Sequence, residues 1–77
     1  MVVYSLEKQV TDSGYYYETT YMKIFATEAI AKKYMMELIQ QESTKFKFNN
    51  EKTFAESKNL FIRYIITKHT VIDKWGY

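Results

Sequence analysis

Apolar and polar side chains alternate along residues 2–10, VVYSLEKQV. A period of two with one apolar side is typical of a half-buried strand. Thr11, Asp12, Ser13 and Gly14 then predict a turn, because Asp and Ser side chains bond to nearby backbone and Gly accepts a positive φ. The next run, residues 15–25, is rich in Tyr, Thr and Ile, which favour strands. The two runs and the loop between them therefore predict an antiparallel hairpin.

A helix is predicted over residues 28–42, EAIAKKYMMELIQQE. Thr27 precedes this segment as an N-cap, and Glu28 suits the first turn of the helix dipole. The segment contains good helix formers and no Gly. Apolar side chains recur every three and four residues, so the helix has one apolar stripe. The stripe consists of Ile30, Ala31, Tyr34, Met35 and Leu38.

The second half of the chain holds one ambiguous segment and one long strand. In residues 43–58, the run TKFKF could be a short strand, and NNEKTFAESK could be a loop or one or two helical turns capped by Asn50. Residues 60–73, LFIRYIITKHTVID, alternate and predict a long strand. One parity of this strand holds Leu60, Ile62, Tyr64 and Ile66, and the other holds Phe61, Arg63, Ile65, Thr67 and His69.

This order of elements predicts a single α+β domain over residues 1–77, with an antiparallel sheet of three to four strands and one main helix packed on one face. The helix stripe should cover one parity of each strand. The second face should then be less polar than a monomer needs. On the helix side we expect Tyr4, Leu6, Leu60, Ile62, Tyr64 and Ile66, and on the second face Val3, Phe61, Ile65 and Val71 with Arg63, Thr67 and His69 between them.

The aromatic side chains of residues 15–25 occupy both parities, so either orientation of that strand offers rings to solvent. A Tyr in a strand needs no special cause, and residues 43–58 could instead fold over the second face. An apolar patch rich in Tyr, Phe, Met and Arg nevertheless favours a protein interface, and binding between two copies of the chain is one form of it. The predicted protein-binding residues are Tyr15, Tyr17, Tyr21, Phe61, Arg63 and Ile65.

The chain offers little for catalysis. It has no Cys, no Gly-rich phosphate loop and one His, His69, beside which the sequence places no orienting partner. The acidic residues Glu7, Glu18 and Asp73 do not have metal-ligand spacing. We therefore expect no enzyme activity, no cofactor and no metal. The chain also lacks an apolar run long enough for a membrane span and the pattern of a signal peptide, so we expect a cytoplasmic protein without membrane contact.

Nucleic acid is the alternative partner. Basic residues among aromatic ones can hold phosphate and stack bases, and this combination occurs in residues 45–58. Acidic residues dilute the same segment, and the net charge is only +2. The predicted nucleic-acid-binding residues are Lys45, Lys47, Phe46 and Phe48.

Three stretches carry a resemblance: VVYSLEKQ, IFATEAIAKKYMMELI and FIRYIITKHTVID. A hairpin that leads into a Phe-x-Thr-Glu helix cap, and a late strand ending in Tyr-Ile-x-x-x-x-x-Val-x-Asp, resembles a group of small uncharacterised proteins of Gram-positive bacteria and their phages. The likeness covers about two thirds of the chain, and AKKYMM departs from the acidic helix of that group. The resemblance implies this fold, a phage or mobile-element origin, and a protein that inhibits or modulates a host enzyme or defence system.

Overall fold

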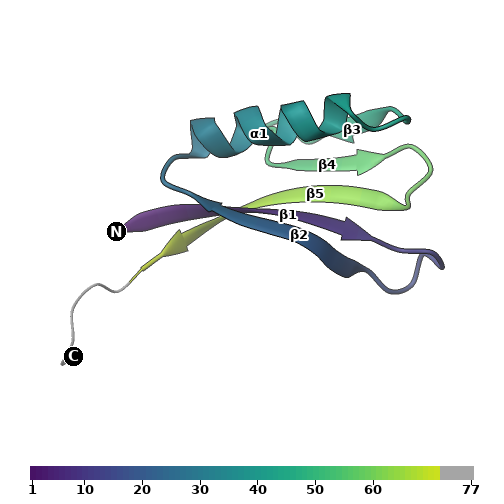
Figure 1. The fold of residues 1–77 in the computed structure, drawn as a ribbon, viewed down its shortest axis with the longest axis horizontal. Coiled ribbons are helices and arrows are strands. Elements are labelled where there is room, and N and C mark those ends of the chain that lie inside the picture. The colour runs from purple at the N-terminus through teal and green to yellow at the C-terminus, as the bar shows by residue number, and fades with distance from the viewer. Residues whose placement is uncertain (72–77) are drawn as a thin grey trace.

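The computed structural model describes residues 1–71 as one antiparallel sheet with a helix on one face (Figure 1). The sheet has five strands in the order β2-β1-β5-β4-β3. The expected α+β class, with an antiparallel sheet and one helix, is confirmed, but the expected three to four strands were too few. The elements are β1 (Val2–Val10), β2 (Glu18–Phe25), α1 (Glu28–Gln40), β3 (Phe46–Phe48), β4 (Phe54–Ser57) and β5 (Ile62–Thr70).

The first hairpin forms as expected, but β2 begins at Glu18 rather than at residue 15. The connection is longer than its four polar residues indicated, and Thr11 organises its first part. The Thr11 hydroxyl accepts hydrogen bonds from the backbone N–H groups of Ser13, at 3.3 Å, and Gly14, at 3.0 Å. Gly14 has a φ of 82°, which Gly adopts without steric cost. Residues 15–17 consequently belong to the connection.

The helix begins where the sequence predicted. The Thr27 hydroxyl accepts from the Ile30 N–H at 3.2 Å, which confirms the N-cap. The helix ends at Gln40, two residues before the predicted end. Its buried stripe also differs from the predicted one, because Ile30 is 45% exposed and Tyr34 is 37% exposed. The helix residues that belong to the buried core or pack against it are Ala31, Met35, Leu38 and Ile39.

Residues 43–58 form a second hairpin, β3–β4, that extends the sheet beyond β5. The helical alternative is therefore wrong, and so is folding of this segment over the second face. The Asn49 side chain, rather than Asn50, shapes the turn: its oxygen accepts from the N–H groups of Thr53, at 2.8 Å, and Phe54, at 3.1 Å. The turn leaves Lys52 with a φ of 58°.

The long C-terminal strand β5 is shorter than predicted, running from Ile62 to Thr70. Leu60 and Phe61 precede it in the connection from β4, so neither lies on a face of the sheet. Leu60 was expected beneath the helix, but it is 56% exposed. Val71, expected on the second face, follows the strand, and the last two residues of the predicted strand lie outside the described part of the chain.

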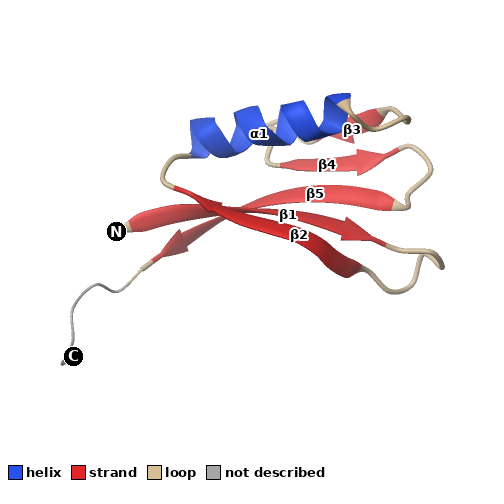
Figure 2. Cartoon of the chain, viewed as in Figure 1, coloured by secondary structure: helices blue, strands red, loops and turns tan. Residues whose placement is uncertain are grey.

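The core lies between α1 and one face of the sheet (Figure 2). Its buried residues come from one parity of β1 and β5, from β2 and β4, and from the helix. This is the parity that the sequence assigned to the helix side, with Tyr4 and Ile62 partly buried at its margin. The buried apolar residues are Leu6, Phe25, Ala31, Met35, Ala55, Tyr64 and Ile66.

The opposite face of the sheet, which we call the outer face, has no helix over it. Its side chains come from the strand residues that alternate with those facing the core. Val3 pairs with His69 across β1 and β5, and Glu7 lies between Met22 on β2 and Ile65 on β5. The uncovered second face that the sequence predicted is thus present in the described part of the chain.

Two adjacent methionines allow the core to be tested. Met35 is fully buried, whereas Met36, the next residue of α1, is 37% exposed. Met35→Ala should lower the free energy of unfolding by about 2–5 kcal/mol, because it removes buried volume. Met36→Ala keeps the same chemistry and helix propensity, and it should have an effect below about 1 kcal/mol. Urea unfolding followed by circular dichroism measures both, and equal effects would contradict this placement of the helix.

Candidate protein-binding site

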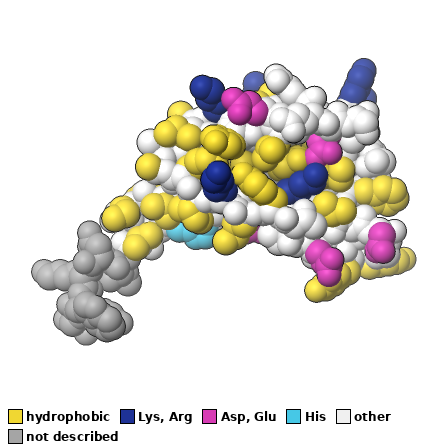
Figure 3. Space-filling view, viewed as in Figure 1, with side chains coloured by type: hydrophobic (Ala, Val, Ile, Leu, Met, Phe, Trp, Pro, Cys, Tyr) yellow, Lys and Arg dark blue, Asp and Glu magenta, His cyan; other side chains and the backbone are white. Residues whose placement is uncertain are grey.

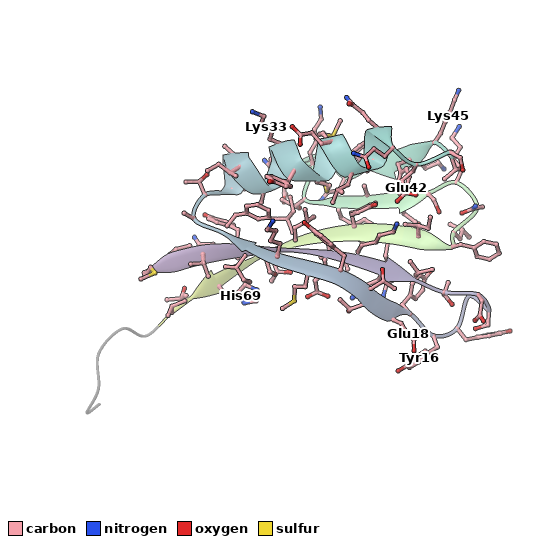
Figure 4. The ribbon with its side chains drawn as sticks, viewed as in Figure 1. Tyr16, Glu18, Lys33, Glu42, Lys45 and His69 are labelled. Carbon is pink, nitrogen blue, oxygen red and sulfur yellow. The ribbon has the colours of Figure 1, made fainter. Side chains whose placement is uncertain are left out.

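Two connections that are distant in sequence meet at one end of the sheet. The β1–β2 and β4–β5 connections lie side by side there (Figure 1), and a hydrogen bond joins them. Figure 4 shows Tyr16 at this end, far from His69 at the other. Four large side chains project from the two connections, and we call them the loop end. They are Tyr15, 95% exposed, Tyr16, 71%, Leu60, 56%, and Phe61, 47%.

Tyr17 fixes the two connections to each other. Its hydroxyl donates to the Leu60 carbonyl at 2.8 Å, across 43 residues of sequence. The Thr11 N–H donates to the Phe61 carbonyl at 2.9 Å and forms a second link. Thr11 is itself buried, so this link is shielded from water. The loop end is therefore held in one arrangement and does not need to be ordered by a partner.

Leu60 has an unusual backbone conformation, with a φ of 67°. A positive φ is uncommon outside Gly, Asn and Asp, and it is unfavourable for a bulky side chain. Neighbouring polar groups hold it: the Asn59 side chain accepts from the Phe61 N–H at 3.1 Å, and the buried Ser57 hydroxyl accepts from the Ile62 N–H at 3.1 Å. The result is an exposed leucine presented beside Phe61.

A polar network continues from the loop end onto the outer face. The Arg63 guanidinium lies over the Tyr17 ring, 3.8 Å from its centroid, and the Arg63 Nε donates to the Gln9 side chain at 2.7 Å. Gln9 in turn donates to the Glu7 carboxylate at 3.1 Å. The Thr19 hydroxyl donates to the same carboxylate at 3.3 Å. These contacts fix the Arg63 side chain beside the aromatic residues.

The six predicted protein-binding residues do not form one patch. Tyr15, Tyr17, Phe61 and Arg63 lie together at or beside the loop end. Ile65 lies farther along the outer face of β5, paired with Glu7. Tyr21 lies on the helix side of β2 and packs partly against the core.

Sequence analysis missed Tyr16 and Leu60 as members of this site. Leu60 was placed in a strand because its parity matched Ile62. The signal that could have separated them is Asn59, since Asn is a turn residue whose side chain bonds to nearby backbone. No feature of the sequence marks Tyr16 as exposed. It is exposed because it lies in the connection between β1 and β2, which Thr11 helps to shape.

The four residues predicted to bind nucleic acid point in different directions in and beside β3. Phe46 and Phe48 face α1 and pack partly against the core. Lys47 is exposed on the other face, opposite Glu56 of β4. Lys45 precedes β3 and projects away from the sheet (Figure 4). The two rings that would stack bases are thus not beside the two exposed ammonium groups.

A charged cluster lines a hollow of about 350 Å³ between the end of α1 and the sheet. Lys8 pairs with Glu42 at 2.8 Å, and the Tyr64 hydroxyl donates a short hydrogen bond to the same carboxylate. Burial alone would raise the pKa of Glu42, but the bonds from Lys8 and Tyr64 outweigh it, so the pKa is lowered. Burial and the adjacent carboxylate raise the pKa of Tyr64 above 10, so its phenol stays protonated. The cluster anchors the chain just after the helix to the sheet.

The sheet also brings Ser5 and His69 together, with the hydroxyl 2.8 Å from the imidazole Nε2. A hydroxyl beside an imidazole is one part of a nucleophilic site, which also needs a group that orients the ring and donors for an oxyanion. Within residues 1–71, the hydrogen bonds show no carboxylate on the other ring nitrogen. In the same range, no three His, Asp or Glu side chains are grouped so that they could hold a metal ion.

Comparisons with known proteins gave no match among protein-family models, curated proteins or solved structures. The helix within the described residues is too short and too polar to cross a membrane.

The lowered pKa of Glu42 predicts a dependence of stability on pH. A carboxylate with a lowered pKa stabilises the fold above its ordinary value of 4.5, and this contribution is lost as the pH falls through the folded-state pKa. Glu42→Gln should therefore lower the free energy of unfolding by about 1–3 kcal/mol at pH 7. The difference between variant and parent should shrink below pH 4.5.

Urea unfolding at several pH values measures this difference. Glu37→Gln is the matched control, because Glu37 is an exposed glutamate on α1, five residues before Glu42. A loss of stability for Glu42→Gln that is the same at pH 7 and pH 3.5 would contradict the role of the carboxylate in the cluster.

Proposed function

We propose that this protein is a small non-enzymatic binding module that attaches to another protein through the loop end. The exposure of Tyr15, Tyr16, Leu60 and Phe61 on two connections that are fixed to each other carries the proposal. Exposed Tyr and Phe beside an Arg are the residues that dominate protein interfaces. The partner surface would therefore present an apolar pocket for these rings.

The fixed arrangement of the loop end supports this proposal over a chance exposure of side chains. A partner that binds a mobile loop must first pay the entropy of ordering it. Here the Tyr17 and Thr11 bonds order the loop before binding. Arg63 is held on the Tyr17 ring and can form a charge-assisted bond to an acidic group on the partner.

The resemblance to small proteins of Gram-positive bacteria and their phages supports a class of partner. We propose that the chain is encoded by a phage or mobile element and that it inhibits or modulates a host enzyme or defence protein. A rigid aromatic projection from a small domain suits this role, since it can fill an existing pocket on a larger protein.

Neither alternative class gains support from a specific observation. An enzyme would need more than the contact between Ser5 and His69. Nucleic-acid binding would need rings beside the ammonium groups, whereas Phe46 and Phe48 pack toward the core. Salt dependence separates the classes, because phosphate contacts weaken steeply between about 50 and 200 mM salt.

Phe61→Asp tests the proposal. The charge should weaken binding of the partner by at least about 2 kcal/mol, or roughly 30-fold, because a carboxylate cannot enter an apolar pocket. Affinity capture from an extract of a Gram-positive host, followed by titration of the captured protein, measures the loss. Met36→Asp is the control, since it adds the same charge at an exposed position on α1.

Circular dichroism must show that Phe61→Asp remains folded. If it unfolds, Tyr15→Asp replaces it, because a side chain that is 95% exposed contributes little to the fold. Capture of the same protein by the parent and by both loop-end variants would refute the proposal. Loss of capture with Met36→Asp alone would place the binding surface on the helix instead.

The strained backbone at Leu60 gives a second test. Leu60→Gly should leave the free energy of unfolding unchanged or raise it by up to about 1 kcal/mol, because Gly accepts the positive φ. The same change should weaken partner binding, because it removes an exposed apolar side chain. Lys52→Gly is the matched control: it also relieves a positive φ, but in the β3–β4 connection, so it should not affect binding. Equal binding by both glycine variants would contradict a role for Leu60.

A further inference from the structure

The strand β2 forms an open edge of the sheet. Within the described residues, its one neighbour is β1, and its other side carries unpaired backbone groups. Such an edge is a template for pairing with another strand. The opposite edge, β3, has three residues, whereas β2 has eight. β2 is therefore the edge that can accept a new strand over a useful length.

Apolar side chains flank this edge on both faces of the sheet. On the outer face, Met22 is 59% exposed and Ile24 is 52% exposed. On the helix side, Ile30 and Tyr34 of α1 are 45% and 37% exposed, and Tyr34 packs against Phe25 of β2. Figure 3, seen with β2 in the foreground, shows hydrophobic side chains gathered along the seam between α1 and β2, with basic groups among them. A strand added at β2 would cover apolar groups above and below it.

Natural proteins protect edges with Pro, charges or bulges. The chain has no Pro, and the bulge in this pairing lies near the start of β2, where Thr20 has no partner opposite it. Lys23 is the one basic residue of β2, and its ammonium lies over the Tyr34 ring, 5.4 Å from the centroid. The stretch from Tyr21 to Phe25 thus remains regular and open to pairing.

We propose that two copies of this chain pair through β2, antiparallel and about a two-fold axis, so that their sheets become continuous. Charge favours a second copy in this orientation. β2 carries Glu18 at its start and Lys23 near its end, so antiparallel pairing brings the acidic end of each strand nearer to the basic end of the other than parallel pairing does, without a direct ion pair. Parallel pairing in register would place the two Lys23 side chains together, which is destabilising.

The symmetry also selects a register. Residues paired across neighbouring strands project on the same face of the sheet. The residue on the two-fold axis therefore lies beside the same residue of the second copy. Lys23 on the axis would oppose like charges. Tyr21 on the axis would carry the pairing across the bulge at Thr20. Met22 on the axis keeps Lys23 off the axis and places the bulge at Thr20 two residues from it.

Pairing centred on Met22 gives complementary neighbours on both faces. Tyr21 of each copy lies opposite Lys23 of the other on the helix side, and Thr20 lies opposite Ile24. The exposed Met22 and Ile24 side chains of the two copies then merge into one apolar group on the outer face. The loop end is formed by other residues and remains free, so this inference goes beyond the binding proposed there and does not depend on it.

The absence of cysteine makes the register directly testable. In Met22→Cys, the two thiols would lie opposite each other, with Cβ atoms about 4.5–5.5 Å apart, so mild oxidation should convert most of the protein into a disulfide-linked dimer. In Ile24→Cys, on the same face of the same strand, the thiols would be separated by four residues, or about 13 Å, which is too far for a disulfide. Non-reducing gel electrophoresis measures both variants.

Light scattering of the unmodified chain provides the second measurement. We expect a mass near twice the 9.3 kDa of one chain, and a shift toward the single-chain mass in Met22→Lys, which places like charges at the axis. Tyr15→Lys adds the same charge at the loop end, and it should leave the mass unchanged.

A single-chain mass at every concentration tested would overturn the proposal. So would a linked dimer for Ile24→Cys in place of Met22→Cys, because it would exclude the Met22 register. A dimer that Ile65→Cys crosslinks, but neither β2 cysteine does, would show that the copies meet through the outer face instead. Failure of any loop-end variant to bind a partner would leave all of these outcomes unaffected.

Discussion

The packing of one helix on one face of the sheet is the contact on which the rest of the structure depends. Ala31 and Met35 of α1 are completely buried against the sheet, in one cluster with Leu6 of β1 and Tyr64 of the central strand β5. One helix of 13 residues cannot cover five strands on both sides. The uncovered outer face and the exposed flank of β2 follow from this shortage of covering structure.

A small core also makes the polar anchors important. Residues 1–71 contain seven buried apolar residues, a small core for a domain of this length. The cluster of Lys8, Glu42 and Tyr64 fastens the end of the helix to the sheet, and the Tyr17 bond fastens one connection to the other. Each anchor joins segments that are distant in sequence.

Sequence alone predicted the elements that have long, regular patterns. The parity of β1 and β5, the Thr27 cap and the uncovered second face could all be derived from periodicity and capping chemistry. The β3–β4 hairpin could not, because a three-residue strand has too few residues to show a period. The loop end was only partly visible, since Leu60 continues the alternation of β5 and only its hydrogen-bonded neighbours turn it outward.

The backbone conformation of Leu60 bears on both the stability of the domain and its proposed function. A positive φ at leucine is unfavourable, and a small domain has little stability with which to offset it. The buried Ser57 hydroxyl and the Asn59 side chain nevertheless hold this conformation. The Leu60 side chain is more than half exposed, so its burial contributes little to stability. Within the monomer the backbone of Leu60 has a use, because its carbonyl accepts the bond from Tyr17, but its exposed side chain has none, so we explain that side chain by what it contacts outside the monomer. This reasoning favours the loop end over the outer face as the surface proposed to meet a partner protein.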